Sequence, residues 1–273
     1  MSNKKTHRMI LEREDAIRVI RNYYNKTLED EHGRFMSWRH CYNVFRENRN
    51  KTDDEILDYL ALHLAFYLAS WGMYRGSSFL LGKDYKVYIP IVRLIMEEKY
   101  NDLCGISAEE LCKEENLELI KEISNKIRKI FLEEYPTIEG KNNNATDTLV
   151  SKILLGTLGC TPAYDRYYIQ AVKRYEISTG KYGNDSLKSV AEYYIRYKED
   201  FEKVRAEISR CGIEYPPMKL MDMCMWQIEY EREQEEKRKN SCLTETKQTG
   251  GQFHEKIYQN FTHNNFTRSS NYA

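Results

Sequence analysis

Helix signals recur along this chain, and no stretch alternates apolar and polar residues with the period of a strand. Two segments, Thr52-x-x-Glu55 and Ser107-x-x-Glu110, have the capping-box pattern that opens a helix. Only 13 Gly and 5 Pro are available to interrupt 273 residues. The sequence therefore predicts an all-α protein.

The helical segments are expected to form two lobes around a cleft, followed by a disordered tail. Tyr135-Pro136 ends a long helical pattern, because proline disfavours helical geometry in the residue before it. We therefore expect an N-terminal helical region at 1–139 and a C-terminal one at 140–239. From 240 to 273 Ser, Thr, Asn, Gln and Gly predominate over aliphatic residues, which predicts a tail without a packed core.

Composition and termini limit the class of protein. No apolar run reaches the roughly 18 residues that a membrane-spanning helix needs. The first residues, Met1–Lys5, lead into a charged helical pattern and not into a signal sequence. We therefore expect a cytoplasmic protein that does not associate with a membrane.

Seven cysteines are scattered along the chain without a C-x-x-C pair. Zinc sites and iron–sulfur clusters need closely spaced cysteines, so we expect reduced thiols, no metal site and no cofactor. The formal net charge is zero, which argues against a broad surface for polyanions. The first fifty residues are nevertheless basic, so either one basic face or evenly solvated helices fits the charge pattern. The oligomeric state is left open.

The segment Thr148–Tyr168 carries the most specific signal. Leu149, Ile153 and Leu158 repeat at helical spacing and indicate a buried helix that Gly159 would end. Pro162 suits the first turn of a following helix. Asp165 would then lie in that first turn, where free backbone N–H groups favour an anion.

Within this segment, Cys160-Thr161-Pro162-Ala163-Tyr164-Asp165-Arg166 resembles the region around the catalytic aspartate of the helix-hairpin-helix DNA glycosylases. In that superfamily a buried helix leads through a short turn into an aspartate that opens the next helix. Residues 140–147 lack the pair of glycines of the family's hairpin, and no lysine stands at the spacing of its lyase-type members. The resemblance covers about 20 residues.

This resemblance implies a glycosylase-like fold and a monofunctional DNA N-glycosylase, or an inactive relative. Such an enzyme would excise a modified or damaged base from DNA in repair or antiviral defence. Asp165 would be catalytic, stabilising the cationic sugar and orienting water. The structural alternative is an acid at a helix start with no further role.

Eight further residues are candidates for substrate binding. The loop from Trp71 to Ser78 ends an apolar helix with two glycines, an arginine and two hydroxyls, which suit a phosphate group; a glycine-terminated helix with Trp71 in the core is the alternative. Tyrosines near Asp165 could stack on a base or fill space between helices. The assigned residues are Trp71, Arg75, Ser77, Ser78, Lys152, Tyr164, Arg166 and Tyr168.

Two other functions remain open from the sequence. A non-catalytic helical module could bind nucleic acid or protein through the same surfaces. Arg34 and His40 fit the R-x(4–6)-H pattern of HEPN ribonucleases, which offers a third possibility, an RNA-cleaving enzyme. The methionines around Trp226 are interpreted as apolar packing.

Overall fold

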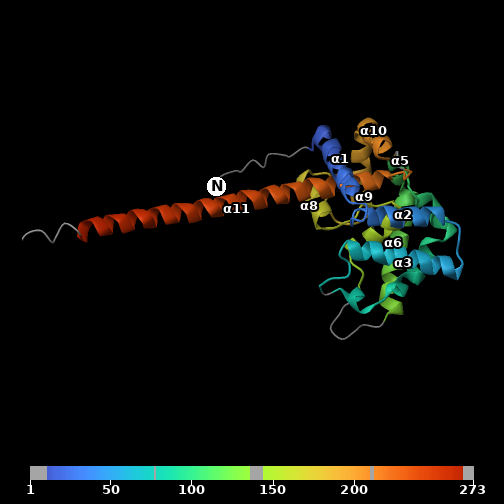
Figure 1. Cartoon of the computed structure of the whole chain (residues 1–273). Coiled ribbons are helices and arrows are strands. Elements are labelled where there is room, and N and C mark those ends of the chain that lie inside the picture. Colours follow the sequence, from blue (N-terminus) through green and yellow to red (C-terminus); the bar gives the residue numbers. More distant parts are fainter. Residues whose placement is uncertain (1–10, 77, 136–143, 210–211, 267–273) are drawn as a thin grey trace, which may run out of the picture. The chain divides into compact units, whose positions relative to one another are not determined.

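The computed structural model describes residues 11–76, 78–135, 144–209 and 212–266, with the backbone alone for 242–266. Throughout these ranges the regular structure is helical, with no strand (Figure 1), so the all-α prediction is confirmed. The α-helices are α1 (Arg13–Glu29), α2 (Met36–Glu47), α3 (Asp54–Ser70), α4 (Ile89–Ile95), α5 (Ala108–Leu111), α6 (Glu114–Glu134), α7 (Asp147–Thr157), α8 (Arg166–Arg174), α9 (Asn184–Arg196), α10 (Lys198–Ile208) and α11 (Pro217–Phe266). Short 3₁₀ helices are η1 (Phe79–Gly82), η2 (Tyr85–Tyr88) and η3 (Glu98–Leu103).

Two compact units divide the chain, Met1–Glu229 and Tyr230–Ala273. The lobe boundary expected near residue 139 falls in 136–143, outside the described residues, and the two-lobe arrangement stays a prediction. The last helix, α11, continues past Lys239 to Phe266, although the sequence analysis places a disordered tail from residue 240. None of the described helices is both long and apolar enough to cross a membrane.

Helix starts follow the capping signals with one correction. Ser107 is the N-cap of α5, and its hydroxyl accepts a hydrogen bond from the Glu110 amide. At α3 the cap is Asp53, whose carboxylate accepts from the Ile56 amide, and not Thr52 as the capping-box pattern predicts. Either residue type can cap a helix, so the spacing to Glu55 placed the start one residue early.

The centre of the first unit is α7, which packs against α2, α3 and α6. Its buried residues surround the helix on all sides and include the polar side chains of Ser151, Lys152 and Thr157. Gly156 lies against the ring of Tyr67 on α3, and a Cβ at this glycine would stand 2.5 Å from the tyrosine Cε1. The absent side chain therefore lets α7 and α3 approach closely.

We expect Gly156→Ala to lower the free energy of unfolding by about 1–3 kcal/mol, the usual cost of overpacking a core. Helix propensity acts in the opposite direction, because alanine is about 1 kcal/mol better than glycine inside a helix. Denaturant unfolding should show the loss, and combining the change with Tyr67→Leu should recover part of it. A Gly156→Ala protein as stable as the wild type would mean that the helices separate at little cost.

The end of α7 confirms the prediction for Gly159, which has φ +67° and donates its amide to the Leu154 carbonyl. The expectation for Pro162 is wrong, because α8 begins at Arg166 and residues 162–165 have no helical structure. This stretch is buried against other side chains and its amides bond to them. The amide of Ala163 donates to Asp222, and that of Tyr164 donates to Ser151. Distant side chains thus provide acceptors for the amides of this stretch, which stays non-helical up to Asp165.

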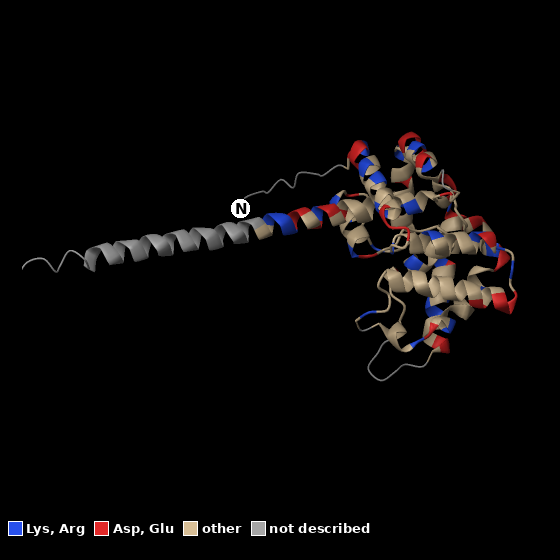
Figure 2. Ribbon diagram, viewed as in Figure 1, with Lys and Arg blue, Asp and Glu red and all other residues tan. Residues whose placement is uncertain are grey.

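The arginines of α1 do not form one basic face. Arg13 contacts Asp200, and Arg21 contacts Glu207, so α1 arginines pair with acidic residues of α10. Arg18 pairs with Asp15 on its own helix. Figure 2 shows positive and negative segments alternating along both α1 and α10. The mixed, solvated-helix alternative therefore holds for this pair of helices.

Candidate functional site

Asp165 is the N-cap of α8, whereas the predicted helix start at Pro162 placed it inside the first turn. One carboxylate oxygen accepts a hydrogen bond from the Tyr168 amide at 3.1 Å. The other lies 3.6 Å from the ammonium nitrogen of Lys152 on α7. The Asp165 side chain is 15% exposed and that of Lys152 is 5% exposed, so this is a nearly buried ion pair.

Burial affects the titration of both partners. It raises the pKa of Asp165 above its ordinary value, an effect that the Lys152 charge opposes and that of Asp222 reinforces. Burial also lowers the pKa of Lys152, and the nearby positive charge of Arg75 acts in the same direction, while Asp165 opposes it. Each group therefore keeps its charge largely because the other is present.

Trp71 connects the end of α3 to this pair. It is the C-cap residue of α3, and its carbonyl accepts a hydrogen bond from the Lys152 ammonium at 3.1 Å. The ammonium also lies 5.6 Å from the centre of the Trp71 ring. The two segments that the sequence analysis singled out, around Trp71 and around Asp165, thus meet at Lys152.

Five rings form what we call the aromatic cluster: Tyr23, Phe35, Trp71, Tyr167 and Trp226. Trp226 is buried and contacts the other four rings edge-on at centroid distances of 5.3–6.0 Å. Phe35, Trp71 and Tyr167 are only half-buried, so part of the cluster faces solvent.

Two arginines border the cluster. The guanidinium of Arg34 lies 5.2 Å from the Trp71 ring centre, 5.3 Å from that of Phe35 and 5.9 Å from that of Trp226. Arg75 folds back over Gly72, where a Cβ would stand 3.1 Å from the guanidinium carbon. Arg34 and Arg75 are both exposed.

A second ion pair, on α11, contacts the segment that leads into Asp165. Lys219 and Asp222, both on α11, are 2.7 Å apart, with side chains 3% and 8% exposed. The other Asp222 oxygen accepts from the Ala163 amide, two residues before Asp165. The Lys219 ammonium also lies over the rings of Tyr23 and Trp38, each at 4.9 Å. This pair therefore ties the first turn of α11 to the buried segment that leads into Asp165.

The remaining candidates lie elsewhere or serve the fold. Ser78 caps η1 by accepting from the Leu80 amide, and Ser77 lies outside the described residues. Tyr164 and Tyr168 are fully buried, with ring centres 4.9 Å apart, and the Tyr164 hydroxyl contacts Ser186. These two tyrosines follow the packing alternative. Arg166 is exposed at the start of α8, with its guanidinium over Tyr167.

Sequence reasoning missed most of the cluster. Trp226 lies among the methionines, whose burial confirms the packing interpretation, but the ring itself completes the cluster. The one usable signal was Lys219 and Asp222, two charges inside an apolar helical run. Charged residues on a buried helix face are seldom found without a partner. The sequence pattern linked Arg34 to His40 as in a ribonuclease, but Arg34 packs on the rings of the cluster. His40 is exposed. Burial lowers the pKa of His63, and the nearby His40 lowers it further.

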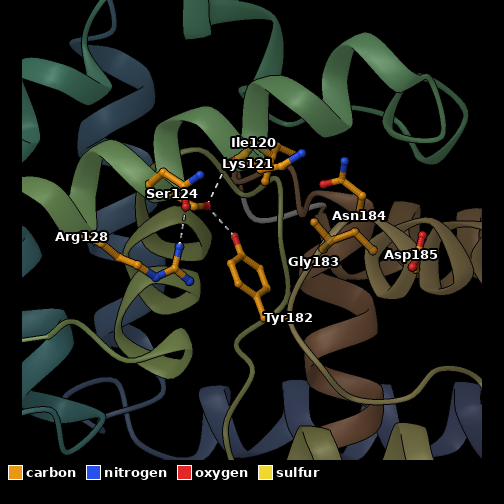
Figure 3. A pocket seen from close by; sticks show the side chains of 10 residues that line it. Ile120, Lys121, Ser124, Arg128, Tyr182, Gly183, Asn184 and Asp185 are labelled. Carbon is orange, nitrogen blue, oxygen red and sulfur yellow. Dashed lines mark hydrogen bonds between the residues drawn. The ribbon is translucent and has the colours of Figure 1, made fainter.

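A separate pocket of about 360 Å³ lies between α6 and the loop before α9 (Figure 3). Ser124, Arg128 and Tyr182 line it, and the two hydroxyls are hydrogen-bonded at 2.9 Å. Arg128 pairs with Asp147 and Lys121 with Glu118, so neither cation is left for a ligand. No residue of the Asp165 site lines this pocket.

Metal ligands do not gather in the part of the chain that the structure describes, where no group of three His, Cys, Asp or Glu could hold an ion. The described cysteines are free thiols, and Cys41, Cys160 and Cys224 are buried. Comparison with models of known protein families, with curated proteins and with solved structures gives no match to this chain.

Proposed function

We propose that this chain is a monofunctional DNA N-glycosylase that removes a modified or damaged base, with Asp165 as its catalytic residue. The observation that carries the proposal is the Asp165 carboxylate, held beside Lys152 next to a partly open aromatic cluster. In the reaction, water adds to C1′ of the sugar as the bond from C1′ to the base nitrogen breaks. The base leaves with the electron pair of that bond and takes up a proton.

Asp165 suits the demands of this step. The sugar becomes cationic as the base departs, and a fixed carboxylate stabilises that charge more strongly in a water-poor site than in bulk water. The Tyr168 amide, the N-terminal end of α8 and Lys152 all favour the ionised carboxylate. Its partial exposure leaves an edge at which a sugar can approach.

Lys152 serves in this proposal as a positioning residue. Its ammonium is held between the Trp71 carbonyl and Asp165, which fixes the carboxylate relative to the aromatic cluster. A monofunctional enzyme forms no bond between lysine and the abasic sugar. We therefore expect no covalent adduct with DNA when borohydride, which traps such imines, is added during the reaction.

The aromatic cluster would receive the base. An enzyme acting on a base in a duplex must take that base out of the stack and hold it between apolar or aromatic groups. The half-buried rings of Phe35, Trp71 and Tyr167 provide such surfaces close to Lys152 and Asp165. Stacking on an aromatic side chain contributes about 1–3 kcal/mol per base.

A panel of substrates separates this function from the two alternatives. Labelled DNA duplexes carrying uracil, hypoxanthine, an alkylated purine or an oxidised guanine are incubated with the full chain and then heated in alkali. Strand breaks at the modified position support the glycosylase. Cleavage of a matched RNA without alkali would support the ribonuclease, and binding without either product would support a non-catalytic module.

A further inference from the structure

Two positive charges, those of Lys152 and Arg34, lie against the Trp71 indole, and that of Arg75 lies against the next residue in the chain; within the described part of the chain, Lys152 alone of the three has a carboxylate partner. Lys152 pairs with Asp165. Arg34 lies over the indole ring, and Arg75 folds against Gly72, the next residue in the chain after Trp71. Among the described residues, no hydrogen-bond acceptor contacts the guanidinium of either arginine.

This arrangement differs from that of other arginines in the molecule. Arg13, Arg21 and Arg174 all reach carboxylates on other helices, and Arg174 contacts the buried Glu229 at 3.1 Å. Arg34 and Arg75 hold their side chains against rings and backbone, which leaves their N–H groups to solvent or to a ligand. Each guanidinium presents a fixed fork of donors that matches a phosphate or carboxylate group.

Trp71 contributes a further observation. Its indole N–H is buried and has no acceptor within the described structure. A buried donor without an acceptor destabilises the folded protein, because the group has lost its hydrogen bonds to water. The site therefore offers donors and positive charge beyond what its own carboxylates use, and a ligand that fits it brings acceptor atoms and negative charge.

We propose that Arg34 and Arg75 bind the phosphate group of the nucleotide whose base enters the aromatic cluster. The inference rests on the proposed function and narrows its substrate to phosphate esters, excluding free nucleosides. A nucleotide carries its phosphate one sugar away from the glycosidic bond. In this arrangement the aromatic cluster faces the base of the nucleotide, Asp165 faces its sugar, and the two arginines face its phosphate. The phosphate belongs to a DNA strand or to a free nucleotide, and the two arms of the test separate these sources.

The first arm measures binding to a fluorescein-labelled DNA duplex with one tetrahydrofuran residue, an analogue of an abasic site, by anisotropy at several salt concentrations. Arg34→Gln and Arg75→Gln should each weaken binding and reduce the slope of log K against log salt by about 0.9 for each phosphate that is no longer neutralised. Arg34→Lys, which keeps the charge, should keep the slope. Arg93→Gln is the matched control, since Arg93 is exposed and pairs with Asp54 at the opposite end of α3.

The second arm measures binding of the four deoxynucleoside monophosphates and their nucleosides by calorimetry. Arginine-dependent binding of monophosphates, with no effect of the variants on the duplex, assigns the phosphate to free nucleotides. If all variants bind both kinds of probe as the wild type does, the assignment of Arg34 and Arg75 is overturned. Base release from the duplexes is measured separately. If the arginine variants still release the base, the glycosylase function is retained whatever the binding result. Arginine-dependent binding without base release would refute only the chemistry at Asp165.

Discussion

Asp165→Asn is expected to lower the rate of base release by about 10²–10³-fold, the usual cost of losing one well-placed electrostatic stabiliser. Asparagine keeps the volume and can still accept the Tyr168 amide, so α8 should keep its cap. The loss should fall on kcat, because the sugar becomes cationic only in the transition state. DNA affinity should stay the same or rise slightly, since a negative charge near the phosphates is removed.

The pH profile adds a signature of the carboxylate. Burial raises the pKa of Asp165 above its ordinary value of 3.8, so the wild-type rate should fall as the pH drops through this raised pKa and the ionised form is lost. Asp165→Asn should lack this acidic limb. The matched control is Asp147→Asn, which changes an exposed acid in the first turn of α7 and should leave the rate unchanged. Full activity of Asp165→Asn would make Asp165 a capping residue only.

Asp222→Ala is expected to lower the free energy of unfolding by about 3–5 kcal/mol, because it leaves the buried Lys219 ammonium without its carboxylate. The Ala163 amide also loses its acceptor. Asp222→Asn should cost less, since an amide oxygen can still accept from Ala163. Denaturant or thermal unfolding measures both changes.

An exposed pair provides the control for Asp222. Glu199→Ala breaks the surface pair of Glu199 with Lys203 on α10, and it should lower the free energy of unfolding far less than Asp222→Ala, because both side chains are exposed to water. If Asp222→Ala is as mild as this control, then Lys219 reaches water or shifts its position at little cost. The segment before Asp165 would then be held by its other contacts, and the Lys219–Asp222 pair would not be needed for the stability of the fold.

The sequence predicted the helical class and the end of α7 because local signals decide them. Helical spacing, a scarcity of breakers and a glycine at positive φ act within a few residues. The start of α8 was misplaced because Pro162 has the right local geometry for a first turn, while distant side chains, Ser151 and Asp222, accept the amides of that segment instead. No local pattern reports such partners.

The site was predictable in part for the same reason. Asp165, Trp71, Arg75 and Lys152 were found as separate candidates, but their meeting at Lys152 depends on how α7 packs against α3 through Gly156 and Tyr67. Trp226 completes the cluster and Arg34 borders it through tertiary contacts between residues far apart in the sequence. Tyr164 and Tyr168 looked like binding residues because they neighbour Asp165, yet the course of the chain before α8 turns both inward.

The most direct test of the Asp165 site is to measure the product itself. DNA treated separately with an alkylating agent, an oxidant and nitrous acid is incubated with the wild-type chain, with Asp165→Asn and with Asp147→Asn. Free bases are quantified by mass spectrometry, and abasic sites are counted with an aldehyde-reactive probe. We expect the wild type and Asp147→Asn to release one free base for each abasic site, and Asp165→Asn to release about 10²–10³-fold less in the same time. No release by the wild type from any of the three DNAs, or equal release by Asp165→Asn, would contradict the proposed chemistry at Asp165.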